Sequence, residues 1–235
     1  MNDLGVAIQQ SGNGAPGPVM VDFVGGKLGF RRRRQGPTPT IVKAAGVRSD
    51  IRPEVWDLTA GLGQDAFVLA LYGCSVTMFE RQPIIHCLLV DALDRARDYS
   101  GEDGESLHTI IDRLTLRQSD SIKVLSDLDD KADRPEVIYI DTMFPERSKT
   151  AKIKKGMQVF QQLLGEDSDS VQLLELALQC ARNRVVVKRP KLGEALGLHP
   201  PNLQFSGKSI RFDVYTIKKL ERGKGKTGKT TNSGG

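Results

Sequence analysis

The pattern that most constrains the fold is an alternation of short apolar runs with segments of helical periodicity. Strands that alternate with helices predict a mostly parallel sheet covered on both faces, hence an α/β fold. The runs VIYI and VVV suit central strands, which are buried on both sides. The strand-like runs are VWDLTA, CSVTMFE, LTLRQSD, VIYID and RVVVKRP, with a final strand pair in FSGKSIRFDVYTI. Helical patterns cover residues 65–72, a segment opened by Pro83, and residues 121–128, 153–164 and 171–181.

Composition divides the chain into four expected parts. They are a flexible N-terminus over residues 1–18, a small N-terminal subdomain over 19–50, the main domain over 51–220, and a disordered basic tail over 221–235. In the subdomain, VMVDFV predicts a strand, RRRRQGPTPT a basic loop, and Thr40 the cap of a short helix. The apolar and charged fractions are those of an ordinary globular protein. Without an apolar run of about 18–20 residues or a secretion signal, we expect a cytoplasmic protein.

The cysteines and the net charge bound the function further. Cys74, Cys87 and Cys180 lie in apolar stretches and are expected to be buried reduced thiols. The three histidines are too dispersed to form a metal site with them. The formal charge is +5, and the tail from Glu221 onward carries +3 of it. The basic residues are therefore clustered locally. Such clusters are equally typical of a surface that binds a polyanion such as nucleic acid and of an ordinary solvated surface.

The stretch DLTAGLGQDA, residues 57–66, places a glycine turn between the first strand and the first helix. Gly61 and Gly63 permit tight backbone geometry and close approach of a ligand. Glu80 closes the next strand, where a carboxylate can accept both hydroxyls of a ribose. Together these features indicate a cofactor that contains a nucleoside.

The carboxylates around this turn indicate which nucleoside-containing cofactor the site would bind. Asp65 at the helix start would repel the pyrophosphate of a dinucleotide, and Asp57 precedes the turn. S-adenosylmethionine, with an ammonium and a sulfonium, suits such a site better. Asp120, after the third strand, could accept from the adenine amino group. Capping of a turn or a helix is the alternative role of Asp57 and Asp65.

VIYIDTMFPERS combines an acid, an aromatic ring and a proline at the end of a buried strand. Asp141 could accept a hydrogen bond from an exocyclic amine of a base and hold it in line with a methyl group. Phe144, presented by a turn that Pro145 stiffens, could stack on that base. Alternatively, Phe144 covers the end of the sheet and Asp141 caps the next turn.

The motifs VDFVGGKLGFRRR, DLTAGLGQDAFVLA, FERQP, YIDTMFPERSKTAKIKKGMQVFQ and RVVVKRP, in this order, resemble the RsmJ family. The resemblance covers about Val19 to Tyr215. It implies a class I S-adenosylmethionine-dependent methyltransferase fold, Rossmann-like with a mostly parallel seven-stranded sheet, and a small N-terminal extension. It also implies an enzyme that methylates the N2 exocyclic amine of a specific guanine in 16S rRNA of the small ribosomal subunit.

Carried over residue by residue, the resemblance assigns cofactor contacts and a catalytic turn. In this chain Thr142 stands where the family's turn has its first proline, and Gln64 stands where an arginine is common. The turn comprises Asp141, Met143, Phe144 and Pro145. With the glycine turn, the expected cofactor-binding residues are Asp57, Gly61, Gly63, Gln64, Asp65, Glu80, Arg81, Asp120, Ser121 and Asp141.

The basic residues are candidates for an RNA path that gives salt-dependent affinity and little sequence choice. The target guanine is expected to leave its stack to reach Asp141. No metal is implied. Two other hypotheses stay open at this point: an NAD-dependent oxidoreductase, and a non-catalytic RNA-binding factor with a methyltransferase fold. The candidate RNA contacts are Arg31, Arg32, Arg33, Arg34, Lys149, Lys155, Lys188 and Arg189.

Overall fold

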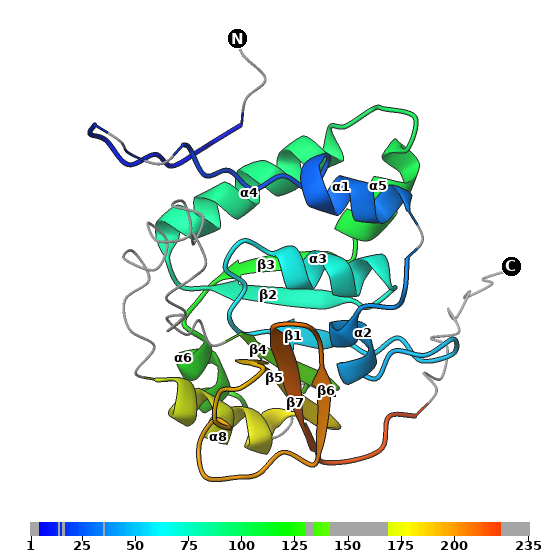
Figure 1. Cartoon of the computed structure of the whole chain (residues 1–235), viewed down its shortest axis with the longest axis vertical. Helices are drawn as coiled ribbons and strands as arrows, with labels where there is room; N and C mark the ends of the chain where they lie inside the picture. Colours follow the sequence, from blue (N-terminus) through cyan, green and yellow to red (C-terminus); the bar gives the residue numbers. More distant parts are fainter. Residues whose placement is uncertain are drawn as a thin grey trace, which may run out of the picture.

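The computed structural model describes residues 5–13, 15, 17–34, 36–129, 134–141 and 169–221. Within them, seven strands form one sheet in the order β3-β2-β1-β4-β5-β7-β6 (Figure 1). The strands are β1 (Val55–Asp57), β2 (Val76–Glu80), β3 (Leu114–Gln118), β4 (Val137–Asp141), β5 (Arg184–Pro190), β6 (Leu203–Ser206) and β7 (Ile210–Thr216). The helices are α1 (Gly26–Arg33), α2 (Thr40–Ala44), α3 (Gln64–Leu71), α4 (Pro83–Arg97), α5 (Gly104–Ile111), α6 (Ser121–Ser126) and α8 (Ser170–Cys180).

The register of the sheet brings strand ends together. Strands β3, β2, β1, β4 and β5 are parallel neighbours, while β7 runs antiparallel between β5 and β6. Asp141 pairs with Lys188 across β4 and β5. Because the carboxyl ends of parallel strands share one edge, the polar residues that close them meet there.

Alternate residues of the central strands point into two apolar cores. Tyr139 lies in one core with Phe67 of α3 and Leu89 of α4, whereas Ile138 and Ile140 lie in the other, against α6 and α8. Figure 1 shows the corresponding layers, with α1, α3, α4 and α5 on one side of the sheet and α6 and α8 on the other. Burial on both faces explains why VIYI carries no charged residue before Asp141.

The strands expected after residue 50 and most of the expected helices are confirmed. Pro83 is the first residue of α4, where its missing N–H costs nothing. α8 also forms, but its buried residues include Leu173 and Ala177, while Val171 is 44% exposed. α5 was not predicted. The helical pattern of residues 153–164 lies outside the described residues.

Two predictions for residues 19–34 are wrong. Residues 19–24 do not form a strand; Val19 makes one isolated bridge to Ile8. The Asp22 carboxylate instead accepts from the amides of Val24 and Gly25, which turns the chain, and Gly26 follows with φ of +55°. α1 starts directly after this turn, so the first three arginines lie on a helix and not in a loop.

The segment 19–50 packs closely on the main body. Phe23 is fully buried and stacks on Phe67 of α3, with ring centroids 5.3 Å apart. Ile41 and Val42 of α2 are buried in the same core. α2 forms as predicted, but Thr40 is its first residue and Pro39 its N-cap, so Thr40 does not cap it. The division of the chain at residue 50 stays a prediction.

The described cysteines are free thiols. Cys74 and Cys180 are buried as expected, but Cys87 is exposed, so that part of the prediction is wrong. Cys87 follows the buried Ile85 and precedes the buried Leu88 on α4, and its position on the helix turns it toward solvent. No helix within the described ranges is long and apolar enough to cross a membrane.

Candidate functional site

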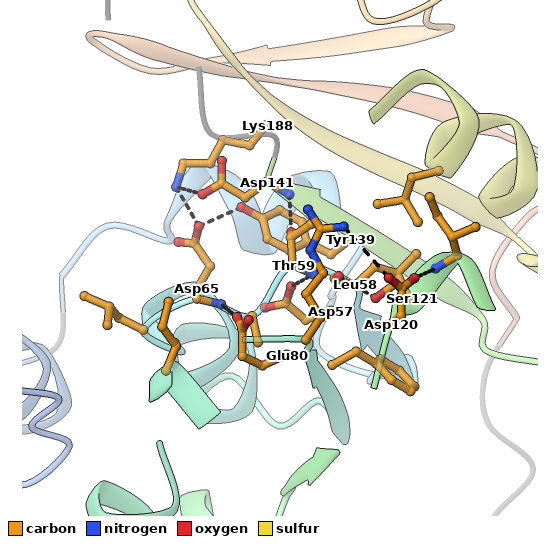
Figure 2. A pocket seen from close by; sticks show the side chains of 18 of the residues that line it. Asp57, Leu58, Thr59, Asp65, Glu80, Asp120, Ser121, Tyr139, Asp141 and Lys188 are labelled. Atoms are coloured by element: carbon orange, nitrogen blue, oxygen red, sulfur yellow. Dashed lines mark hydrogen bonds and ion pairs between the residues drawn. The ribbon is translucent and has the colours of Figure 1, made fainter. Parts of the chain in front are cut away.

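A cavity of about 230 Å³ opens at the carboxyl edge of the sheet (Figure 2). The ends of β1, β2, β4 and β5 form it, together with the starts of α3, α6 and α8. Of the predicted cofactor-binding residues, all except Gly63 line it. The polar and glycine lining residues are Asp57, Thr59, Gly61, Gln64, Asp65, Glu80, Arg81, Asp120, Ser121, Tyr139, Asp141, Asp169 and Lys188.

The two glycines of the turn have different roles. A Cβ on Gly61 would meet one atom within 4 Å, the Thr59 carbonyl oxygen at 3.8 Å, so the backbone here is open to the cavity. A Cβ on Gly63 would lie 2.9 Å from Leu89 Cδ2 and 3.0 Å from Phe23 Cζ. A side chain at Gly63 would therefore point into the core, and Gly63 does not line the cavity; its role as a cofactor contact stays a prediction. With φ of +68° it caps α3 and lets the helix pack closely.

Glu80 is fixed by backbone amides. Its Oε2 accepts from the N–H of Gly61 at 3.0 Å and its Oε1 accepts from the N–H of Gln82 at 2.7 Å. Burial raises the pKa of this carboxyl, and the two backbone hydrogen bonds oppose that effect. The side chain thus stands at the end of β2 in one orientation, where each oxygen keeps a further lone pair for a ligand hydroxyl.

Asp57 is the most deeply buried acid of the cavity, with 1% of its surface exposed. Burial raises its pKa to about 8, although the N–H of Thr59 donates to it at 3.1 Å and lowers the pKa in part. Asp57 is therefore mostly protonated at neutral pH. This differs from the expected role, because a neutral carboxyl offers a ligand hydrogen bonds and not a full negative charge.

Asp120 and Ser121 join the end of β3 to α6. Asp120 caps the helix by accepting from the N–H groups of Ile122 and Lys123. Its other oxygen lies 3.9 Å from Arg81, which also reaches Asp169 at 3.3 Å. Ser121 donates to the carbonyl of Leu58 at 2.6 Å. Capping and a ligand contact are compatible here, since the capping uses one carboxylate oxygen.

The far wall of the cavity holds a network of ion pairs. Lys188 Nζ lies 2.7 Å from Asp65 Oδ2 and 2.9 Å from Asp141 Oδ2. The Tyr139 hydroxyl donates to the same Asp65 oxygen at 2.6 Å. The Asp141 N–H donates to Thr59 Oγ1, also at 2.6 Å. Figure 2 shows Lys188 reaching between the two carboxylates, so Asp141 does face the cavity bounded by Gly61 and Glu80.

The predicted RNA contacts differ in exposure and in position. Arg31, Arg33 and Arg34 are exposed on or next to α1. The Arg32 side chain is 1% exposed and binds Asp103, and Arg189 is 6% exposed with its guanidinium on the carbonyl of Glu194. In this conformation Arg32 and Arg189 cannot reach a phosphate, and both brace the fold instead. Lys188 lies inside the cavity. The residues Met143, Phe144, Pro145, Lys149 and Lys155 lie outside the described residues.

Sequence reasoning missed four polar residues of the site: Thr59, Tyr139, Asp169 and the pocket role of Lys188. Tyr139 sits in an apolar run and reads as a core residue, while its hydroxyl reaches Asp65. Lys188 is predicted from the sequence only as an RNA contact. The pairing of VIYID with RVVVK as adjacent parallel strands could have placed Lys188 beside Asp141.

Known proteins resemble this chain over most of its length. The family described as "Putative SAM-dependent methyltransferase" matches residues 1–217. Ribosomal RNA small subunit methyltransferase J of Marinobacter nauticus is 48% identical over 94% of this chain and 77% of its own length. The protein of the same name from Cellvibrio japonicus is 44% identical over 94% of this chain and 83% of its own length.

The chain belongs to the ribosomal RNA small subunit methyltransferase J family of S-adenosylmethionine-dependent methyltransferases. A solved structure, the SAM-dependent methyltransferase of Neisseria gonorrhoeae, has 37% identity and a TM-score of 0.68 over 92% of this chain and 82% of that one. The expected class I fold is thus confirmed, and the nicotinamide-dependent oxidoreductase is set aside.

The lining of the cavity fits the family's methyl donor. S-adenosylmethionine carries two positive groups, an ammonium and a sulfonium, and one carboxylate of its own, so its net charge is positive. Its binding site should therefore hold a surplus of negative charge. The open backbone at Gly61 leaves room beside Glu80 for a ribose. Apart from the mostly neutral Asp57, five carboxylates face two cations: Asp65, Glu80, Asp120, Asp141 and Asp169 against Arg81 and Lys188. The part of the chain that the structure describes shows no metal-ligand cluster.

Proposed function

We propose that this methyltransferase modifies the N2 exocyclic amine of a guanine in the 16S rRNA of the small ribosomal subunit. The observation that carries the proposal is the position of Asp141. It closes β4 inside a cavity that suits S-adenosylmethionine, in a chain whose relatives are named for the small-subunit RNA. Since ribosomal subunits are its substrate, we expect the protein to act in the cytoplasm.

Asp141 supplies what this chemistry lacks. The lone pair of an aromatic amine is delocalised into the ring, so the amine is a poor nucleophile. A carboxylate that accepts its N–H hydrogen bond restores part of that lone pair and holds the nitrogen in line. When bound, S-adenosylmethionine supplies an activated methyl group. The nitrogen forms the new bond to this carbon as the carbon–sulfur bond breaks, and the surplus proton leaves the nitrogen for Asp141 or water.

The other lining residues hold the donor in our proposal. Glu80 accepts from the ribose hydroxyls, Asp120 and Ser121 lie at the adenine end, and Asp65 lies where the donor's ammonium would be attracted. The catalytic roles of Met143, Phe144 and Pro145 stay predictions from the resemblance. Exposed Arg31, Arg33 and Arg34 on the α1 side would supply contacts to RNA phosphates, with affinity that falls as salt rises.

The test uses small subunits from cells that lack this one modification. Purified protein with labelled S-adenosylmethionine should label their 16S rRNA once per subunit, and mapping should place the label on a guanine N2. The Asp141→Asn variant should bind subunits and donor yet transfer little, which would exclude a non-catalytic RNA-binding role for the parent. Donor binding without any incorporation by the unaltered protein would overturn the proposed substrate.

A further inference from the structure

Lys188 lines the cavity, and the function proposed above gives it no part. It sits on β5 directly beside Asp141 in the sheet register, and its side chain is 24% exposed. Its ammonium makes short contacts with both Asp65 and Asp141, at 2.7 and 2.9 Å. Short charge-assisted hydrogen bonds of this kind fix the orientation of both partners.

The charge around Lys188 explains why it stays protonated. Burial alone would lower its pKa, but Asp141 and Asp65 outweigh burial, and the pKa of Lys188 lies above its ordinary value. The groups that face this network are Asp57 of β1, Asp65 of α3, Tyr139 and Asp141 of β4, and Lys188 of β5. Tyr139 remains a neutral donor because burial and then Asp65 raise its pKa.

Without the lysine, two carboxylates would share one small, partly buried space. Like charges at such a distance raise the proton affinity of one of them, and a protonated Asp141 no longer accepts from an amine or takes up a proton. The network therefore needs a cation, and the fold supplies one from the neighbouring strand.

Resting on the proposed function, we propose that Lys188 is the positioning residue of methyl transfer: it orients the Asp141 carboxylate and keeps it ionised beside Asp65. It acts through Asp141 and does not touch the reacting nitrogen. This role differs from an RNA phosphate contact, which would place the ammonium in solvent and leave Asp141 unaffected.

The experiment compares Lys188→Met, which removes the charge, with Lys188→Arg, which keeps it. Lys218→Met, at the exposed opposite edge of the sheet, is the matched control. Single-turnover transfer to subunits lacking the modification is measured across pH 5–9. With Lys188→Met we expect a rate at pH 7 that is lower by about 10–100-fold, and an acid limb moved up by about one pH unit. Lys188→Arg should recover a large part of the rate and the original limb.

A phosphate contact would give a different result. Lys188→Met would then weaken subunit binding and reduce its salt dependence by about one counterion, with an unchanged pH profile. That outcome would overturn the positioning role. So would a Lys188→Met variant with normal rate and profile.

A second readout needs no RNA. Carboxyl NMR of the protein without ligand, with the Asp141 signal assigned through Asp141→Asn, follows its titration directly. We expect the midpoint of Asp141 to lie higher in Lys188→Met than in the unaltered protein, and Lys218→Met to change nothing. A raised midpoint with no transfer by the unaltered protein would reject the substrate and keep the role of Lys188. An unchanged midpoint of Asp141 in Lys188→Met, with normal transfer by the unaltered protein, would reject the role of Lys188 and keep the substrate.

Discussion

The carboxylates of the cavity are held in two different ways on its two sides. Asp57, Glu80 and Asp120 are bound by backbone N–H groups within three residues of themselves or in the adjacent glycine turn. Asp65 and Asp141 are bound by side chains from other elements, above all by Lys188. Backbone amides keep an acid in place whatever its neighbours do, whereas the ion-pair side depends on one long, flexible side chain. We associate the first side with holding the donor and the second with the reaction.

The largest effect should come from the ion-pair side. Asp141→Asn keeps the shape of the side chain but removes the charge that attracts the amine and takes up its proton. We expect single-turnover transfer to fall about 100–1000-fold. Affinity for S-adenosylmethionine, measured by calorimetry, should change little. Asp112→Asn, an exposed acid at the end of α5, is the control. If Asp141→Asn lost donor affinity and transfer rate equally, the two sides of the cavity would not have separate roles in binding and reaction.

A pH effect should come next, from the buried Asp57. Its pKa is about 8 in the folded protein and near the ordinary value of 3.8 in the unfolded chain. Between these values the folded state binds the proton and the unfolded state does not, so stability falls as pH rises through this window. Asp57→Asn cannot titrate at this position. We expect its unfolding free energy to fall by about 1 kcal/mol less per pH unit, between pH 6 and 8, than that of the unaltered protein.

Urea unfolding at several pH values measures this difference. Parallel stability curves for Asp57→Asn and the unaltered protein would show that Asp57 is ionised in the fold. Asp57 would then carry a negative charge into the cavity after all.

Glu80→Gln tests the backbone-held side itself. The NH₂ of the new amide would face one of the two backbone N–H donors that now bind the carboxylate. The site would also lose one acceptor for a ribose hydroxyl. We expect the dissociation constant for S-adenosylmethionine to rise about 10–30-fold, from the loss of one charged hydrogen bond. Transfer at saturating donor should stay near normal. A slow reaction with unchanged affinity would place Glu80 in the chemistry.

The smallest effect should be structural. Asp120→Ala removes the cap of α6 and should cost about 1 kcal/mol of unfolding free energy. Asp127→Ala, at the other end of the same helix, is the matched control, because its side chain caps nothing at the N-terminus. Comparable losses for both variants would show that charge near the helix, and not the cap, is what matters.

Much of this arrangement could be read from the chain in order. An apolar run that ends in an acid predicts a buried strand whose last residue reaches the ligand edge, and Asp57, Glu80, Asp120 and Asp141 all lie there. The hydrogen bonds of Glu80 and Asp120 are mostly local, to groups next to them in sequence, so pattern and chemistry were sufficient.

Local patterns failed where a partner is distant in sequence. Nothing near Arg32 shows that its side chain is buried on Asp103, 71 residues away. Likewise, the turn alone does not reveal that a side chain at Gly63 would meet Leu89 and Phe23 in the core. The sequence does not distinguish four neighbouring arginines. The helix points the first three in different directions, and the side chain of Arg32 turns inward.

The sequence by itself determined the family, through the resemblance of its motifs. It also determined the α/β fold and the acids that close the strands, because these follow from periodicity and from residues adjacent in the chain. Only the tertiary structure decided that Lys188 joins Asp65 and Asp141. Those three residues come from β5, α3 and β4, separated by up to 123 positions. Their meeting depends on strand order and register, which hydrogen bonds between distant segments fix and which no local pattern encodes.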